Sequence, residues 1–289
     1  MNEAMFWSKA DGGAVRCALC PHNCKIPEGS AGFCGVRRNV GGKLHAESYG
    51  KVSAVALDPI EKKPLYRFHP GKRVLSIGSF GCNLRCSFCQ NSDISIDYEK
   101  TWRDAQTLSP ADVTALAVRT VPRGSIGVAY TYNEPLIGYG FVCDCAGLVR
   151  EVGLSNILVT NGYVNQEPLE ALLPLIDAMN IDLKSFTQGF YRKLGGDLET
   201  VKATIALAQQ HCHVEITTLV IPGENDSEEE IAAPAKWIAS IDPEIPLHLT
   251  RFFPRFKYAG RAATPQRTIH RLGEVAGRYL KNVFAGNMG

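Results

Sequence analysis

From Arg73 to its C-terminus, the chain alternates short β-branched runs with helical patterns, and this alternation restricts the possible folds more than any other feature. Strands are predicted at 73–78, 126–132, 156–160, 179–183, 213–221, 245–252 and 282–285. Helices are predicted between them at 109–120, 138–152, 166–176, 197–210, 227–240 and 265–280. Strict alternation produces parallel strands joined by right-handed crossovers. Six or seven such units are too few for a complete eight-stranded barrel and too regular for an irregular α/β domain.

The first 70 residues differ from the rest of the chain in composition and periodicity. They are rich in glycine, proline and cysteine and contain few long periodic segments. We therefore predict two parts, a cysteine-rich metal-binding or cluster-binding region at 1–70 and a barrel at 71–289. A chain of 289 residues with 45% hydrophobic residues can bury a core of that size.

Charge and hydropathy exclude several partners. The formal net charge is only +2, and no stretch carries five successive like charges, so neither nucleic acid nor an anionic membrane surface is expected as a partner. The N-terminus lacks the pattern of a signal peptide, and no run of eighteen apolar residues follows. We expect a cytoplasmic protein, in which grouped cysteines indicate metal binding more often than disulfides.

The segment "GCNLRCSFCQN" at 81–91 places Cys82, Cys86 and Cys89 directly after the first predicted strand. In parallel α/β folds, ligands bind at the C-terminal ends of the strands. Three thiolates suit an iron-sulfur cluster whose fourth iron takes an exchangeable ligand. The alternatives are a zinc site that recruits a fourth ligand such as His69, or a chance group of cysteines.

The C-x3-C-x2-C spacing, with an aromatic residue (Phe88) just before the third cysteine, resembles the signature of radical S-adenosylmethionine (SAM) enzymes. The resemblance implies an α/β fold, a partial (β/α)6 TIM-like barrel, here with a cysteine-rich N-terminal extension. It implies a 4Fe-4S cluster on Cys82, Cys86 and Cys89, with SAM chelating the open iron. It further implies reductive cleavage of SAM to a 5′-deoxyadenosyl radical, a reductant such as flavodoxin or ferredoxin, and hydrogen abstraction from a substrate that the sequence does not identify.

Later strand ends offer polar groups that could hold SAM. Asn133 and Glu134 end the second strand, and the glutamate matches the carboxylate of the family's glycine-glycine-glutamate motif, which would accept a hydrogen bond from the methionyl ammonium. Thr160, Asn161 and Gly162 end the third strand and suit ribose hydroxyls. For that segment an ordinary Asn-Gly turn is the alternative.

The fourth and sixth strands add further candidates. Asp182 and Lys184 resemble the aspartate-x-lysine motif of the glycyl-radical activase branch and are predicted to contact SAM or substrate as cofactor-binding and catalytic residues. The alternative is a surface ion pair. His248 and Arg251 on the sixth strand are also expected to line the cofactor cavity, although for His248 taken alone a core histidine is the favoured interpretation.

A second cysteine group, C-x2-C-x3-C-x9-C, comprises Cys17, Cys20, Cys24 and Cys34. Four thiolates can bind zinc or a complete 4Fe-4S cluster, and spacing does not separate the two. We favour an auxiliary 4Fe-4S cluster because the chain already has to receive one cluster. The remaining cysteines, Cys143, Cys145 and Cys212, are predicted to have no special chemistry.

The N-terminal cysteine pattern followed by "DPIEKKPLYRFHPG" is similar to the AmmeMemoRadiSam-system radical SAM proteins, which are close to the pyruvate formate-lyase activating enzymes. The favoured interpretation is an enzyme that encloses a small molecule or side chain beneath the cysteine-rich region. The alternatives are a glycyl-radical activase acting on a protein partner, a two-cluster ferredoxin-like electron carrier, and a zinc-dependent interaction protein.

Overall fold

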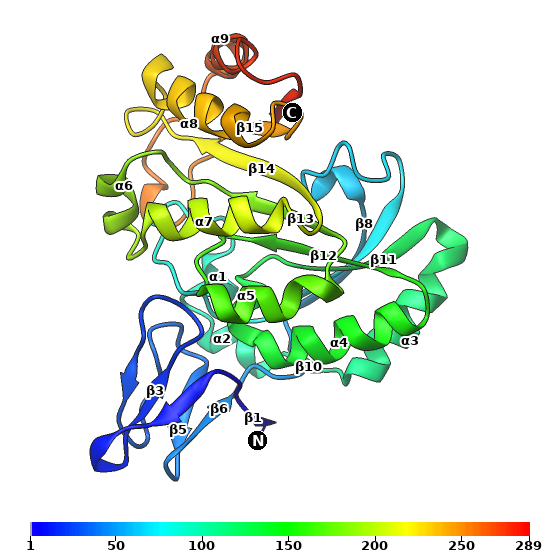
Figure 1. Cartoon of the computed structure of the whole chain (residues 1–289), viewed down its shortest axis with the longest axis vertical. Coiled ribbons are helices and arrows are strands. Elements are labelled where there is room, and N and C mark those ends of the chain that lie inside the picture. Colours follow the sequence, from blue (N-terminus) through cyan, green and yellow to red (C-terminus); the bar gives the residue numbers. More distant parts are fainter. Residues whose placement is uncertain (1) are drawn as a thin grey trace.

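The computed structural model describes residues 2–289 and is built around an eight-stranded sheet (Figure 1). Its strand order is β16-β15-β14-β13-β12-β11-β9-β8. The parallel strands are β9 (Arg73–Gly78), β11 (Ser125–Thr131), β12 (Ser155–Thr160), β13 (Ala178–Asp182), β14 (His213–Val220), β15 (Leu247–Arg251) and β16 (Val283–Gly286). The edge strand β8 (Ala54–Pro59) runs antiparallel to β9. The predicted α/β partial barrel is confirmed.

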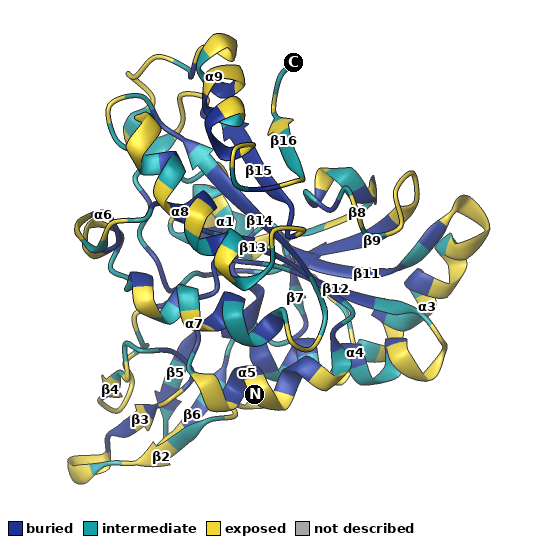
Figure 2. Ribbon diagram, turned by 45° about the horizontal axis from the view of Figure 1, so that its top comes forward, coloured by how far each residue is buried: buried dark blue, intermediate teal, exposed yellow. Residues whose placement is uncertain are grey.

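Helices connect these strands and cover the outside of the sheet (Figure 2). They are α3 (Pro110–Thr120), α4 (Tyr139–Glu151), α5 (Gln166–Leu172), α7 (Leu198–Ala208), α8 (Glu228–Ile241) and α9 (Gln266–Ala276). Each begins within one residue of its predicted start, but α5 and α9 end earlier than predicted. Pro174, which cannot continue an α-helix, lies in the 3-10 turn η5 (Leu173–Leu175) after α5, and Gly277 follows α9.

Shorter elements were not apparent from the sequence because they contain too few residues to show a period. They include α1 (Ser92–Ser95), α2 (Glu99–Arg103), α6 (Gln188–Lys193), and the antiparallel pair β7 (Lys51–Val52) and β10 (Gln106–Thr107). The other 3-10 turns are η1 (Asp11–Gly13), η2 (Ile60–Lys62), η3 (Val121–Arg123), η4 (Pro135–Gly138) and η6 (Phe256–Tyr258).

The N-terminal region forms two small antiparallel sheets beside the barrel, at the lower left of Figure 1. One sheet contains β1 (Asn2–Glu3), β6 (Lys43–Ala46) and β5 (Arg37–Val40), and the other contains β2 (Trp7–Lys9), β3 (Val15–Cys17) and β4 (Lys25–Ile26). The barrel sheet itself starts with β8 and therefore before the predicted boundary at residue 70. Residues 54–59 belong structurally to the barrel because they pair along the whole of β9.

The segment after β8 closes the barrel at the end where the strands begin. Ile60 and Leu65 are fully buried in one hydrophobic cluster with strand residues Val74, Ala129, Ile157 and Ala178. The Pro64 carbonyl accepts a hydrogen bond from the Asn180 side chain at 2.8 Å. The Glu215 carboxylate accepts from the backbone N–H groups of Tyr66 and Arg67 at 3.0 and 2.7 Å. We call residues 58–67, the last two residues of β8 and the segment after it, the floor segment.

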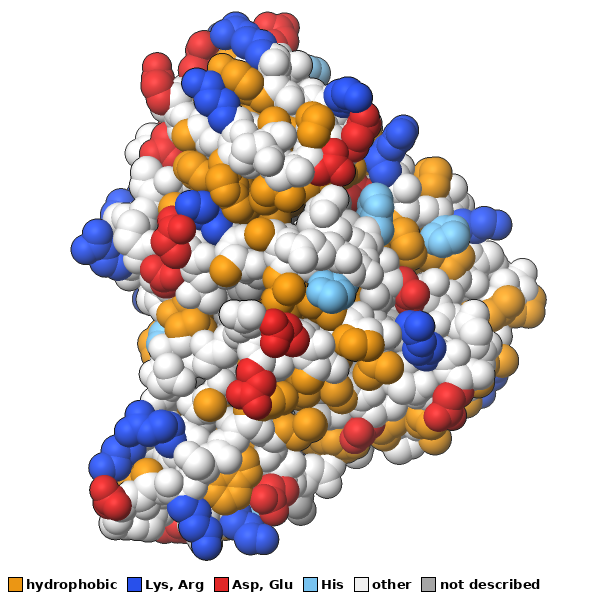
Figure 3. Space-filling model, in the orientation of Figure 1, with side chains coloured by type: hydrophobic (Ala, Val, Ile, Leu, Met, Phe, Trp, Pro, Cys, Tyr) orange, Lys and Arg blue, Asp and Glu red, His pale blue; other side chains and the backbone are white. Residues whose placement is uncertain are grey.

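The surface gives no further guide to partners. Figure 3 shows charges of both signs spread over the face in view, as the near-balanced composition predicts. No helix in the part of the chain that the structure describes is long and apolar enough to cross a membrane.

Candidate active site

The cysteine loop between β9 and α1 has a fixed backbone. Gly81 has a φ of 83°, and a Cβ at this position would lie 2.7 Å from the carbonyl oxygen of Cys34, so only glycine fits there. Its N–H donates to the Ile94 carbonyl at 2.8 Å. The Arg85 guanidinium donates to the Cys82 carbonyl at 2.7 Å and lies over the Phe33 ring. The loop is thus held from both the barrel and the N-terminal region.

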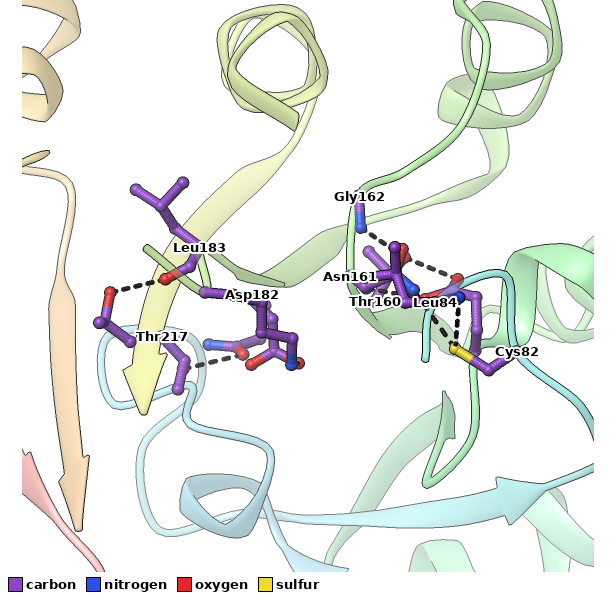
Figure 4. Close-up of polar contacts among 12 residues, drawn as sticks. Cys82, Leu84, Thr160, Asn161, Gly162, Asp182, Leu183 and Thr217 are labelled. Atoms are coloured by element: carbon purple, nitrogen blue, oxygen red, sulfur yellow. Dashed lines mark hydrogen bonds and ion pairs between the residues drawn. The ribbon is translucent and has the colours of Figure 1, made fainter. Parts of the chain in front are cut away.

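The structure brings most of the predicted site residues to one cavity of about 320 Å³ at the carboxyl ends of the strands. Those that line it are Cys82, Cys86, Cys89, Asn133, Glu134, Thr160, Asn161, Asp182 and Lys184. Figure 4 shows Cys82, Thr160 and Asn161 on one side and Asp182 with Thr217 on the other. The geometry follows from the fold, because each of these side chains comes from a strand end or the loop after it.

The three thiols suit a cluster with one open position. Burial raises the pKa of Cys82, Cys86 and Cys89, that of Cys86 to about 12, so a metal that binds them must displace protons. Cys82 Sγ accepts contacts from the Leu84 N–H at 3.4 Å and from Asn161 Nδ2 at 3.6 Å. Within residues 2–289, no three His, Cys, Asp or Glu side chains are placed to hold a single metal ion. The thiols border a cavity, which is the space that a multi-iron cluster requires.

Glu134 is almost fully buried and organises the neighbouring turn. Its Oε1 accepts from Leu136 N–H at 3.0 Å and Thr160 Oγ1 at 2.7 Å, and its Oε2 accepts from Asn161 N–H at 2.7 Å. Burial raises the pKa of this carboxyl to about 7, against the effect of these hydrogen bonds. A carboxylate has about four acceptor positions, so about one remains for a ligand ammonium.

Gly162 shapes the turn but does not line the cavity. Its φ is 67°, and its N–H donates to Thr160 Oγ1 at 3.1 Å while its carbonyl accepts from Thr204 at 2.8 Å. A Cβ here would lie 2.9 Å from Ile181. The Asn-Gly pair is therefore both a turn and a part of the site, because Asn161 reaches the cavity only when Gly162 turns the chain.

Asp182 and Lys184 form an ion pair of 2.7 Å inside the cavity. The Lys184 side chain is 16% exposed and that of Asp182 is 30% exposed, so this is not a surface pair. Burial alone would lower the pKa of Lys184, but the charge of Asp182 and the hydrogen bond to it raise the pKa above its ordinary value. The ammonium group stays charged beside the cysteines.

The structure does not place His248 in the cavity. Its ring does point into the barrel, but its Nε2 lies 2.6 Å from Glu215 Oε2 and the ring packs against Tyr66 and Phe284. Thr250, two residues further along the same face of β15, is the residue that lines the cavity. The expected cofactor contact of His248 is therefore wrong. This residue lies nearer the start of β15 than the cavity does and packs with Glu215 and Tyr66 at the barrel floor.

Arg251 also lies outside the cavity. Its Nε donates to the Thr264 carbonyl at 2.8 Å, and its guanidinium lies 4.8 Å from the centre of the Phe253 ring. Residues three apart in a strand face opposite sides, so Arg251 cannot share the inward face of His248. Its expected role at the cavity is wrong for that reason.

Several cavity residues were not predicted. The unpredicted polar residues are Lys62, Lys63, Gln90, Asn91, Ser95, Thr131, Tyr132, Thr217 and Thr250. The threonines occur in buried strand runs where sequence does not distinguish inner from outer faces. The two lysines lie between β8 and β9, in the "DPIEKKPLYRFHPG" stretch, which only its likeness to related proteins had marked.

The four N-terminal cysteines, Cys17, Cys20, Cys24 and Cys34, line a separate small cavity of about 10 Å³. Burial raises the pKa of Cys34, and that of Cys20 to about 12. Cys143 and Cys145 lie on α4, away from both groups. The structure therefore brings the four thiols together around one cavity, although as placed they do not surround a single metal ion.

Asn83 connects the two cysteine groups. Its carbonyl lies 2.9 Å from His22 Nε2, its Nδ2 donates to the Tyr163 carbonyl, and its Oδ1 accepts from Asn161 at 2.9 Å. The N-terminal region therefore docks beside the cysteine loop, but no residue before Lys62 lines the large cavity. The expectation that the cysteine-rich region covers this cavity is wrong.

Three thiols on a strand-end loop and polar groups at the neighbouring strand ends thus form one candidate site. The model of the radical SAM superfamily matches residues 76–234, which is more than half of the chain. The chain belongs to this superfamily and is an enzyme of the radical SAM class, for which a 4Fe-4S cluster and SAM follow from the family.

Individual relatives agree with this assignment. The chain is 40% identical over its whole length to an uncharacterized protein of Methanocaldococcus jannaschii, 86% of which it covers. It is 27% identical over 55% of its length to the pyruvate formate-lyase 1-activating enzyme of Escherichia coli K12, 65% of which it covers. Streptococcus suis SuiB, solved with its precursor peptide SuiA, shares the fold with a TM-score of 0.55 at 13% identity, over 71% of this chain and 46% of SuiB.

Proposed function

We propose that this protein cleaves SAM reductively and uses the resulting radical to abstract hydrogen from a substrate. The convergence of Cys82, Cys86 and Cys89 with the strand-end residues in one cavity carries the proposal. When bound there, a 4Fe-4S cluster would supply the electron that converts SAM to methionine and a 5′-deoxyadenosyl radical.

The chain's own residues bind and orient the cofactor in this proposal. The buried carboxylate of Glu134 accepts the methionyl ammonium with its remaining acceptor position. Thr160 and Asn161 offer hydroxyl and amide groups to the ribose. The charged ammonium of Lys184, held by Asp182, faces the cavity near Cys86 and orients cofactor or substrate.

A glycyl-radical activase acting on a protein partner is the second candidate. The similarity to a pyruvate formate-lyase activating enzyme favours it, and the N-terminal region does not cover the cavity, so a protein segment would not be obstructed by that region. For both candidates, flavodoxin or ferredoxin is the proposed reductant.

The test is to reconstitute the protein anaerobically with iron and sulfide, reduce it with dithionite, add SAM and measure 5′-deoxyadenosine. We expect product from the wild type and none from Cys82→Ser. Cys212→Ser is the matched control, since Cys212 lies outside both cysteine groups, and it should retain activity. A reduced cluster that yields no nucleoside would support a ferredoxin-like electron carrier, and the absence of iron would support the zinc-dependent alternative.

A further inference from the structure

A buried lysine of the floor segment enters the catalytic cavity and has no role in the function proposed above. Lys63 is 2% exposed and lines the cavity with its neighbour Lys62. Its Nζ lies 2.7 Å from Asp58 Oδ2 and 4.4 Å from the centre of the Tyr132 ring. Burying an ammonium group is unfavourable unless partners replace its water, so this position requires an explanation.

Tyr132 holds an unusual backbone conformation that directs its ring toward this lysine. Its φ of 72° is rare for a residue with a side chain. The ring packs on Gly78, where a Cβ would lie 2.9 Å from Tyr132 Cδ2. The hydroxyl donates to Asp58 Oδ2 at 2.6 Å. Tyr132 and Asp58 thus fix the position of the Lys63 ammonium on two sides.

Asp58 is shared between two lysines. Asp58 accepts from Lys62 at 2.9 Å, from Lys63 at 2.7 Å and from the Tyr132 hydroxyl. Burial opposes its ionisation, but these three donors together hold the pKa of Asp58 well below its usual range, so it stays charged. One carboxylate therefore faces two ammonium groups, of which that of Lys63 is buried and that of Lys62 is largely exposed to solvent. The carboxylate of Asp58 is thus shared between two lysines and is not reserved for Lys63.

Lys63 also has donor capacity to spare. An ammonium group has three N–H bonds, and among the described residues the hydrogen bond to Asp58 is its one side-chain bond. Lys184, the third lysine that lines the cavity, faces Asp182 in a one-to-one pair. The buried ammonium with unused donors is thus found at the floor of the cavity, beside Tyr132.

We infer that Lys63, positioned by Asp58 and Tyr132, binds an anionic group of the substrate, either a carboxylate or a phosphate. The inference rests on the proposed function, because it assumes that the substrate occupies the same cavity as SAM. A charge-assisted hydrogen bond from a buried ammonium recognises such a group strongly. A neutral substrate without an acceptor would leave the unused N–H bonds of this buried ammonium group unsatisfied, so the site selects against it.

The test uses the anaerobically reconstituted full-length protein, saturated with SAM and without reductant. Inorganic phosphate and acetate are titrated separately by calorimetry, so the two arms distinguish the phosphate from the carboxylate. We expect one of them to bind, and Lys63→Met to weaken binding about tenfold or more. Lys281→Met is the matched control, because Lys281 also pairs with one carboxylate, that of Glu244, but lies at the surface; its affinity should equal that of the wild type.

Lys63→Met leaves Asp58 buried without its main partner and could unfold the protein. The double variant Asp58→Asn/Lys63→Met removes both charges of the buried pair and must show the same loss of anion binding with an unchanged circular dichroism spectrum. If the protein forms 5′-deoxyadenosine normally but binds neither anion, the anion site is wrong and the proposed function stands. The same conclusion follows if the folded Lys63 variants bind the anion as tightly as the wild type does. An anion that displaces SAM would overturn the inference too, because Lys63 would then serve the cofactor's carboxylate. Binding that depends on Lys63 in a protein that forms no 5′-deoxyadenosine would support the anion site and contradict the proposed function.

Discussion

At the scale of single residues, Glu134 shows how one side chain can serve both structure and binding. Its three hydrogen bonds join the ends of β11 and β12, and it is 3% exposed. A buried carboxylate with one acceptor position left binds an ammonium group well, because charge-assisted hydrogen bonds strengthen away from water.

We therefore predict that Glu134→Gln weakens SAM binding about tenfold or more, the effect of losing a hydrogen bond to a charged group. Because burial raises the pKa of Glu134 to about 7, its charged form increases with pH through that value. The wild type should bind SAM more tightly above pH 7 than below it, and the glutamine variant should lose this dependence. Calorimetric titration of reconstituted protein at several pH values measures both effects.

Glu199→Gln is the control for this prediction, since Glu199 is exposed and pairs with Lys202 on α7. Its SAM affinity should match that of the wild type at every pH. Equal affinity of the Glu134 variant, with equal iron content, would show that Glu134 holds the turn without contacting the cofactor.

At the scale of elements, the sequence predicted the repeating strands and helices well. It predicted poorly how far along the barrel axis an inward-facing side chain lies. The run at 73–78 became β9 with the same limits, because a β-branched run between turn residues has few other buried arrangements. The same reasoning could show that His248 points inward but not how deep it lies. Depth depends on strand stagger and on the floor segment, and these are long-range contacts that no local pattern contains.

The floor segment illustrates such a contact. Glu215, near the start of β14, is completely buried, and its carboxylate meets two backbone N–H groups of the floor segment as well as His213 and His248. Burial opposes its ionisation, but these partners lower the pKa of Glu215 from 4.5 to about 2. A carboxyl with a lowered pKa stabilises the fold above its unfolded pKa, and this contribution is lost as pH falls from about 4.5 to about 2.

Glu215→Gln should therefore reduce the free energy of unfolding at pH 7 by about 3 kcal/mol, at 1.36 kcal/mol per unit of pKa difference. Urea unfolding of the full-length chain between pH 7 and pH 3 measures this, and the variant should lose less stability than the wild type as the pH falls. Glu228→Gln removes a carboxylate from a surface pair with Arg271 and should change little. A variant as stable as the wild type at pH 7 would show that the floor does not depend on this carboxylate.

At the scale of the whole molecule, two cysteine sites are joined through one loop. The Cys34 carbonyl leaves no room for a side chain at Gly81. The Phe33 ring packs against the Arg85 guanidinium, and the His22 ring contacts the Asn83 carbonyl. The strands of the N-terminal region are two to four residues long before β7. Strands this short have little stability of their own, so a metal or cluster on the four thiols would supply much of the stability of this region.

Changing Cys17, Cys20, Cys24 and Cys34 together to alanine should therefore lower the iron content of reconstituted protein from about eight atoms to about four, if each group holds one 4Fe-4S cluster. The matched variant changes Cys143, Cys145 and Cys212 to alanine and should keep about eight, since these thiols lie outside both cavities. Metal analysis for iron and zinc measures the outcome. A wild type with about four irons and one zinc, with only the zinc lost in the quadruple variant, would assign the N-terminal site to zinc.

Because the N-terminal region packs against Arg85 and Asn83, the quadruple variant should also expose the cysteine loop and hasten loss of the remaining cluster in air, which the decay of its visible absorption would report.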